Sequence, residues 1–325
     1  MLDKQNRRID YLRISVTDHC NFKCTYCMPE EGIQCMPNEA RLSFEEILKI
    51  CRSGAKLGIS KIKITGGEPL VRKDLHVLIK QIKEIPGIDE VTLTTNGFLL
   101  EEKIEALVDA GLDRINISLD TLKHERFKEI TRVDGLDKVL AGIHKAMTYP
   151  LKSVKLNCLV AKNFNEDEIC DLARLTMSGR VSVRFIELMP IGLGPQLKPL
   201  SKQEIKKQLE AEFGPLKPYD GKMGNGPAKY YEIDGFKGKI GFISAVSECF
   251  CEECNRIRLT ADGFLKLCLH SKDGVDLKRL VRAGITEEKL TQVISDATAG
   301  KPVQHHFNDL EIDNIEDKIM AQIGG

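Results

Sequence analysis

Cys20-Asn21-Phe22-Lys23-Cys24-Thr25-Tyr26-Cys27 follows directly on a short apolar stretch, Tyr11 to Val16, that predicts a β-strand. The spacing C-x3-C-x2-C gathers three thiolates in one loop. Three thiolates can bind three irons of a [4Fe–4S] cluster and leave the fourth iron open to a small ligand. A zinc knuckle is the alternative. Zinc needs four ligands, however, and His19 adjoins Cys20, where coordination would be strained. The loop therefore favours an iron–sulfur cluster with one vacant position.

Strands and helices alternate from this loop as far as Phe213. We predict strands at Tyr11–Val16, Lys61–Thr65, Glu90–Thr95, Arg114–Ser118, Ser153–Val160 and Val181–Glu187. We predict helices at Leu75–Ile85, Glu101–Ala110, Asp137–Thr148, Asn165–Leu175 and Ser201–Phe213, and one more that starts at Ser43 with Glu46 completing a capping box. Six strand–helix units are fewer than the eight of a closed barrel. We expect an α/β fold with an incomplete (βα)6 TIM-type barrel, and a doubly wound sheet is the alternative.

A stretch rich in glycine and proline, from Gly214 to Pro227, predicts a domain boundary. We place one domain at residues 1–214 and a C-terminal α+β domain at residues 215–325. In the second domain we predict short antiparallel strands at Lys229–Ile233, Lys239–Ile243, Ile257–Thr260 and Phe264–Leu267. A charged helical tail precedes Gly324–Gly325.

The C-terminal domain carries a second group of cysteines, Cys251, Cys254 and Cys268, with the spacing C-x2-C-x13-C. Again three thiols lie together without an obvious fourth. Cys249 is the rival ligand, and a zinc ribbon that uses it is the alternative. Its short distance in sequence from Cys251 favours a buried free thiol instead. The remaining cysteines are predicted to be small core residues: Cys35, Cys51, Cys158 and Cys170.

The composition excludes some classes of function. The 325 residues include 48 Lys and Arg and 48 Asp and Glu, so the net charge is zero. A general electrostatic attraction to nucleic acid or to an anionic membrane is therefore not expected. No apolar run approaches the roughly 20 residues that cross a bilayer, and Met1 to Arg8 do not form a secretory signal. Together with eleven cysteines in a chain of this size, these features predict a cytoplasmic protein with metal-binding thiols.

The cysteine loop, with its aromatic Tyr26, and the turn Thr65-Gly66-Gly67-Glu68-Pro69 after the second strand resemble the signature of the radical S-adenosylmethionine (SAM) superfamily. In that superfamily SAM chelates the open iron, and an electron from the cluster cleaves it to a 5′-deoxyadenosyl radical. The resemblance implies that Tyr26 contacts the adenine through its backbone and that Gly67 lies in the turn that binds the methionyl amine. It also implies that Ser118 contacts SAM and that Met189 packs on the adenine.

The second cysteine group continues into Cys254-Asn255-Arg256-Ile257-Arg258-Leu259-Thr260, and the chain ends in Gly-Gly. This arrangement is similar to the GTP 3′,8-cyclase family, which acts first in molybdenum cofactor biosynthesis. The resemblance implies a second [4Fe–4S] cluster whose open iron binds the guanine of GTP, and a glycine tail that reaches the active site. It implies that a C3′ radical of GTP attacks C8 to give 3′,8-cyclo-7,8-dihydro-GTP. It also implies catalytic roles for Cys20, Cys24, Cys27, Arg256 and Arg258.

Matched to the family, the GTP contacts are Arg13, Lys63, Thr94, Lys155, Arg184, Arg256 and Arg258. One such cation alone is more often a solvated surface charge. Their recurrence on predicted strands, opposite the cysteine loops, favours a triphosphate site. Lys63 stands where arginine is usual in the family, and lysine keeps the charge but loses the bidentate geometry. The chain has no G-x4-G-K-[ST] motif, which predicts GTP as a substrate of cyclisation and not of hydrolysis.

The resemblance also implies partners. These are a downstream cyclic pyranopterin monophosphate synthase and a reductant such as flavodoxin or ferredoxin, and a homodimer is compatible with it. Two alternatives stay open. One is a radical SAM peptide-modifying enzyme with an auxiliary cluster, which does not need Arg256 and Arg258. The other is a zinc- or iron–sulfur-binding module.

Overall fold

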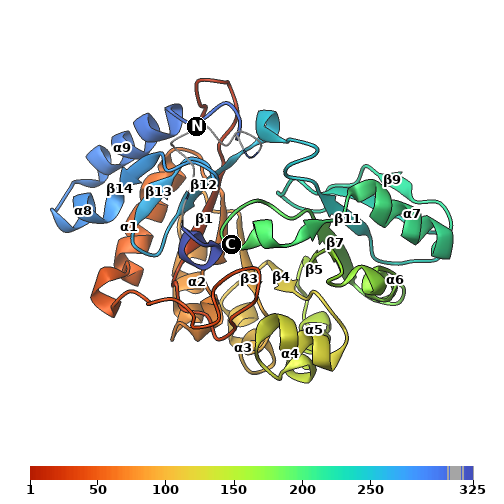
Figure 1. Cartoon of the computed structure of the whole chain (residues 1–325). Helices are drawn as coiled ribbons and strands as arrows, with labels where there is room; N and C mark the ends of the chain where they lie inside the picture. The colour runs from red at the N-terminus through yellow and green to blue at the C-terminus, as the bar shows by residue number, and fades with distance from the viewer. Residues whose placement is uncertain (306, 308–315, 317, 325) are drawn as a thin grey trace.

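The computed structural model describes residues 1–305, 307, 316 and 318–324. Its centre is a run of parallel strands that neighbour one another in chain order (Figure 1). They are β1 (Tyr11–Ser15), β2 (Lys61–Thr65), β3 (Glu90–Thr95), β4 (Arg114–Ser118), β5 (Ser153–Leu159) and β7 (Val181–Ile186). A doubly wound sheet reverses its strand order at a switch point, and this sheet does not. The predicted partial barrel is therefore confirmed, with strand bounds that differ from the prediction by at most one residue.

Helices connect these strands by parallel crossovers. They are α1 (Phe44–Lys56), α2 (Leu75–Lys83), α3 (Leu100–Asp109), α4 (His124–Thr131), α5 (Leu136–Thr148) and α6 (Ile169–Arg174), and α7 (Lys202–Phe213) follows the last of these strands. The predicted capping box is present, since the Glu46 amide donates to Ser43 Oγ and the Ser43 amide donates to the Glu46 carboxylate. Helix α4 was not predicted, because its sequence HERFKEIT is mostly charged and buries little more than Phe127 and Ile130.

Each central strand places most of its apolar side chains on the face toward the helices. Most of its polar side chains lie on the opposite face, toward the cavity. Strand β2 reads Lys-Ile-Lys-Ile-Thr, and Ile62 and Ile64 are fully buried in the apolar core together with Leu78 of α2. Alternate side chains of a strand point to opposite faces. Lys63 therefore points into the inside of the barrel, where it lines a cavity. The helices cover the apolar face, and the side chains of the inner face line the cavity.

The C-terminal strands extend the sheet at both ends, to twelve strands among the described residues, with β14 and β9 at its edges. Strand β11 (Ile240–Ile243) pairs in parallel with β7, and β12 (Arg256–Leu259) pairs in parallel with β1. Beyond them, β10 (Lys229–Glu232) and β9 (Lys217–Tyr219) follow at one end, and β13 (Phe264–Lys266) and β14 (Gly274–Asp276) at the other. The prediction of antiparallel strands is right for β10 with β11 and for β12 with β13. The parallel pairings with β1 and β7 were not predicted, because they join strands far apart in sequence.

The last described residues lie against the sheet. After α8 (Leu277–Arg282) and α9 (Glu287–Ala299), the short α10 (Met320–Ile323), coloured dark blue near the middle of the molecule in Figure 1, brings Gly324 to the strands. A Cβ on Gly324 would lie 2.9 Å from Ser15 Cβ, so the tail packs tightly on β1. Gly325 and most of residues 306–317, where part of the charged tail was expected, lie outside the described residues.

The other short elements lie in connecting loops. Strands β6 (Ala161–Lys162) and β8 (Lys198–Pro199) form a separate pair. The 3-10 turns are η1 (Asn38–Ala40), η2 (Pro69–Val71), η3 (Glu166–Glu168), η4 (Gly194–Gln196) and η5 (Cys251–Glu253). Among the described helices, none has the length and apolar character needed to cross a membrane. The predicted division into residues 1–214 and 215–325 stays a prediction.

Candidate active site

A single cavity along the inner face of the parallel strands is lined by both groups of cysteines. Cys20, Cys24 and Cys27 reach it from the loop after β1. Cys251, Cys254 and Cys268 reach it from the segments before and after the β12–β13 hairpin. The six thiols share this cavity because β12 pairs in parallel with β1. The loop after β1 lies at the carboxyl ends of the strands, whereas the segments before β12 and after β13 lie at their amino ends, so the two cysteine groups lie at opposite ends of the cavity. The structure thus brings the two predicted ligand sets into one chamber.

The thiols of the first cysteine loop are half-buried at the cavity wall, and they influence one another. Burial raises the pKa of Cys20 to about 12 and that of Cys27 to about 11, and it also raises the pKa of Cys24, with a further contribution from the neighbouring thiols. Thiols that resist ionisation when buried together bind a metal with release of their protons. Phe22 anchors the loop by edge-to-face contacts with Phe98 and Phe127 at 5.6 and 5.7 Å. The loop therefore fits an iron–sulfur cluster.

The Gly66-Gly67 turn after β2 clamps this loop. The Gly67 amide donates to Thr17 O and the Glu68 amide donates to His19 O, each at 2.7 Å. A Cβ on Gly67 would lie 2.3 Å from His19 O, which no side chain can accept. The prediction assigned the two glycines to close approach of a ligand. The structure shows that they also allow close approach of the cysteine loop itself.

Glu68 is a buried carboxylate that sequence reasoning did not assign. It accepts hydrogen bonds from Thr95 Oγ1 at 2.7 Å, from the Asn96 amide at 2.6 Å and from the Leu70 amide at 2.9 Å. Burial raises its pKa to about 7, and the hydrogen bonds oppose that rise. Asn96 Nδ2 in turn donates to Asn21 Oδ1 at 2.8 Å, inside the cysteine loop. Glu68 thus fixes the ends of β2 and β3 against the loop.

A second buried carboxylate, Asp120, holds the aromatic residue of the loop. Tyr26 Oη donates to Asp120 Oδ2 at 2.7 Å, and the Leu159 amide donates to Asp120 Oδ1 at 2.8 Å. Burial raises the pKa of Asp120 to about 6. Ser118 at the end of β4 and Met189 after β7 line the same cavity, as predicted residues for SAM. Asp120 was visible in the sequence only as one acid at a strand end.

Cations stand side by side on the inner face of the sheet. The strand register places Arg258 beside Arg13, and Arg13 beside Lys63. Burial and the nearby Arg256 and Arg184 lower the pKa of Arg13 to about 10. Burial, Arg13 and Arg256 also lower the pKa of Lys63 and of Arg258. Buried like charges of this kind destabilise an empty site and favour the binding of an anion.

Arg184 adds a specific sign of an anion site. One of its terminal nitrogens donates to Asn157 Oδ1, whereas its buried Nε–H has no hydrogen-bond acceptor among the described residues. A buried donor without an acceptor is costly, so a ligand oxygen at this position would be stabilising. Thr94 and Arg256 line the cavity with it. The chemistry of this wall fits a polyphosphate.

Two lysines lie differently from the rest. Lys155 Nζ donates to Met223 O, Lys155 is not among the residues that line the cavity, and its pKa is lowered to about 7 by burial and by Arg184. Lys61, two residues before Lys63 on β2, forms an ion pair with Asp10 at 2.6 Å. The other predicted cations and Thr94 all reach the cavity wall.

The second cysteine group lies beside the cations. Although burial opposes ionisation, Arg256 and Lys301 lower the pKa of Cys254 to about 7, and Arg256 Nη2 lies 3.8 Å from the Cys254 sulfur. Arg258 Nη1 donates to Gly324 O at 2.7 Å, which joins the described end of the tail to the same wall. Lys301, which also lines the cavity, was not predicted, because a lone lysine after a helix carries no motif.

The other cysteines correct two expectations. Cys249 was expected as a buried thiol, but it is exposed, because the loop before η5 carries it outward. Cys51 and Cys158 are buried as predicted, whereas Cys35 and Cys170 are only half-buried.

Comparison with known proteins identifies the superfamily to which the chain belongs. The sequence pattern of the radical SAM superfamily matches residues 14–176, and that of the family described as Molybdenum Cofactor Synthesis C matches residues 181–307. The crystal structure of Streptococcus suis SuiB bound to S-adenosylmethionine has a TM-score of 0.60 and 16% identity, with 82% of this chain and 62% of that chain covered. At that identity the likeness shows the fold. The chain is a member of the radical SAM superfamily.

Relatives that align with the whole chain identify its family within that superfamily. A protein of Clostridium perfringens (strain SM101 / Type A) named GTP 3′,8-cyclase is 50% identical over 328 residues, with 100% of both chains covered. A protein of the same name from Pelotomaculum thermopropionicum is 45% identical over the same length and coverage. The chain therefore belongs to the GTP 3′,8-cyclase family.

Proposed function

We propose that this chain uses SAM to convert GTP to 3′,8-cyclo-7,8-dihydroguanosine 5′-triphosphate, the first step of molybdenum cofactor biosynthesis. The observation that carries the proposal is the shared cavity, in which two trios of cysteines lie on either side of a wall of buried cations. An electron carrier needs no such chamber, and a zinc-binding module needs no buried cations. Full-length similarity to GTP 3′,8-cyclases supports the same reaction.

The cysteines divide into two cofactor sites, each for a [4Fe–4S] cluster. We assign Cys20, Cys24 and Cys27 to the cluster that binds SAM, and Cys251, Cys254 and Cys268 to the cluster that binds the guanine of GTP. When bound and reduced, the first site supplies a 5′-deoxyadenosyl radical that can take the 3′ hydrogen of the ribose. Three thiols per site leave one iron of each cube without a protein ligand.

The residues around the first loop would position SAM. We assign Tyr26, Gly67, Ser118 and Met189 to this task. Asp120 holds the Tyr26 ring through its hydroxyl group, so it acts as a positioning residue. Burial of this part of the cavity keeps water and other hydrogen donors away from a short-lived radical. The two substrates would meet at high effective concentration.

The cationic wall would hold the triphosphate. We assign Arg13, Lys63, Thr94, Arg184, Arg256 and Arg258 to GTP. The unsatisfied Nε–H of Arg184 would donate to a phosphate oxygen. Lys155 would join this set when its Nζ exchanges the Met223 carbonyl for phosphate. Arg256 would serve both phosphate and cluster, since it also lies beside Cys254.

The reaction places the chain among partners. We propose a downstream synthase that forms cyclic pyranopterin monophosphate from the product, and a one-electron reductant such as flavodoxin or ferredoxin. All eleven cysteines are free thiols, which supports a reducing, cytoplasmic compartment. A homodimer is compatible with the family resemblance, and light scattering would detect it as twice the mass of one chain.

The test is turnover by the anaerobically reconstituted protein with SAM, GTP and a reductant. We expect 5′-deoxyadenosine and the cyclised nucleotide in equal amounts. An Arg258→Ala variant should keep slow SAM cleavage but lose the cyclised product. If 5′-deoxyadenosine forms while GTP remains intact in the wild-type reaction, GTP is not the substrate.

A further inference from the structure

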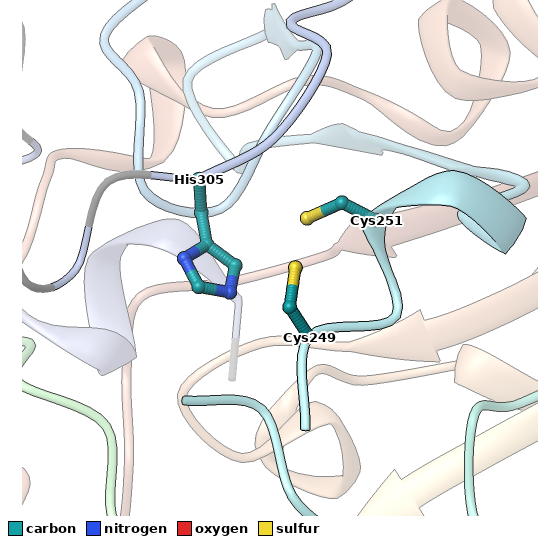
Figure 2. Close-up of side chains that lie close together, drawn as sticks. All are labelled: Cys249, Cys251 and His305. Atoms are coloured by element: carbon teal, nitrogen blue, oxygen red, sulfur yellow. The ribbon is translucent and has the colours of Figure 1, made fainter. Parts of the chain in front are cut away.

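A second set of metal-binding groups lies at the rim of the cavity. Cys249, Cys251 and His305 place one ligand atom each within 4.8 Å of one another, among the described residues. Figure 2 shows the two thiols and the imidazole turned toward one another from two separate segments. Cys249 is exposed, and the other two are half-buried and line the cavity. The group is thus open to ions from solvent.

Arg7 holds the two segments together. Its buried guanidinium donates to Cys251 O and to Val303 O, both at 2.9 Å, and to Pro302 O at 2.6 Å. Asp3 fixes the guanidinium by an ion pair at 2.6 Å. Arg7 therefore ties the backbone of one cysteine to the backbone two residues before His305. The approach of the three donors is built into the fold and does not depend on flexible side chains alone.

The donor set suits zinc. Two thiols and an imidazole are preferred zinc ligands, with bonds of about 2.0–2.3 Å, and tetrahedral zinc leaves a fourth position for water. Such bonds bring ligand atoms to roughly 4 Å or less from one another, so small side-chain rotations would close the site. His305 Nε2 lies 2.7 Å from Ala245 O. Binding through Nδ1 would keep this contact and give up the hydrogen bond that Nδ1 accepts from the Phe307 amide at 3.5 Å, whereas binding through Nε2 would exchange the Ala245 contact for the metal.

We propose that, in the chain without its second cluster, Cys249, Cys251 and His305 form a Zn²⁺ site that excludes that cluster. The exclusion rests on the proposed function in one respect, the assignment of Cys251 to the cluster with Cys254 and Cys268. One sulfur cannot occupy both positions, because the two sites direct it to different partners. Bound zinc would therefore hold the protein in a form that lacks the GTP-binding cluster.

The binding test uses the full chain, stripped of iron under anaerobic conditions and titrated with Co²⁺ and then with Zn²⁺. Thiolate-to-cobalt absorption reports the ligands, and Zn²⁺ displaces Co²⁺ to give the affinity. Cys249→Ser and His305→Ala should each weaken Zn²⁺ binding at this site at least tenfold, roughly the loss caused even by an outer-shell partner. Cys170→Ser, a half-buried thiol elsewhere, is the matched control and should change nothing.

Variants at the other cysteines distinguish this zinc site from the cluster ligands. Cys254→Ser should leave the Co²⁺ spectrum unchanged. If Cys254→Ser or Cys268→Ser removes it while Cys249→Ser does not, zinc uses the cluster cysteines and the proposal is wrong. These results do not involve GTP, so a failure of the proposed reaction would leave them interpretable.

The exclusion is tested by reconstitution with iron and sulfide in the presence of one equivalent of Zn²⁺. The wild-type chain should take up about four irons instead of about eight, and Cys249→Ser should still take up about eight. Equal iron uptake by the wild-type chain with and without Zn²⁺ would overturn the exclusion.

Discussion

Lys63 lies where burial and the neighbouring cations disfavour its positive charge. Burial, Arg13 and Arg184 all lower its pKa in the structure without ligand. A bound triphosphate would restore the charge, so GTP binding should take up protons and weaken as the pH rises. Lys63→Met should reduce this proton uptake and weaken GTP binding about tenfold, which is near the lower end for a charged hydrogen bond. Calorimetry in buffers of different ionisation enthalpy measures both quantities.

The matched control is Lys61→Met on the same strand. Lys61 is paired with Asp10, outside the cationic wall, and its loss should leave GTP affinity and proton uptake unchanged. Proton uptake that is the same in the wild type and in Lys63→Met would exclude Lys63 from the phosphate site.

Glu68 gives a pH dependence of stability with a definite sign. Its pKa is raised from 4.5 in the unfolded chain to about 7 in the fold, so the folded state holds the proton more tightly. This contribution to stability is full below the unfolded value and is lost as the pH rises through about 7. Glu68→Gln should remove that slope and should cost about 1–3 kcal/mol, because an amide nitrogen cannot accept from the surrounding donors.

Urea unfolding of the cluster-free chain between pH 5 and pH 8 measures the slope of stability against pH. Glu102→Gln, an exposed acid on α3, serves as the control and should follow the wild type. A Glu68→Gln variant with the wild-type slope would show that Glu68 stays ionised across this range.

At the scale of elements, the Gly66-Gly67 turn controls the first cysteine loop. Gly67→Ala would push a methyl group into His19 O, so the loop would have to move. We expect the variant to lose the first cluster and keep the second, with about four irons per chain instead of about eight. Gly179→Ala is the control, because a Cβ there would meet only ordinary contacts from 3.5 Å. Full iron content in Gly67→Ala would contradict the clamp.

The elements also show which features sequence can predict. Strand bounds and the Ser43–Glu46 capping box follow from local patterns, and they were predicted closely. The parallel pairing of β12 with β1 was missed, since it joins residues about 240 positions apart. That pairing brings the two cysteine loops to one cavity. That the two groups of cysteines act at one site was expected only through family resemblance.

Within the site, residues with distinctive chemistry could be found from sequence, and their supports could not. The six cysteines and most of the predicted cations reach the cavity. Glu68 and Asp120 are single acids whose partners lie on other strands, so no spacing marks them. The same is true of Arg7, which contacts carbonyls nearly 300 residues away.

At the scale of the whole molecule, one sheet presents two metal sites to one chamber. Two reduced clusters would lie at opposite ends of this chamber, and we expect their electron spins to interact across it. The most direct measurement is therefore the EPR spectrum of the doubly reduced, reconstituted protein. It should be compared with the spectra of Cys24→Ser and Cys254→Ser, each of which should keep one cluster.

We predict that the wild-type spectrum is broadened or split by spin coupling and that SAM and GTP each perturb a different cluster. A wild-type spectrum equal to the sum of the two single-cluster spectra would place the clusters far apart. In that case the two cysteine trios could not serve one reaction.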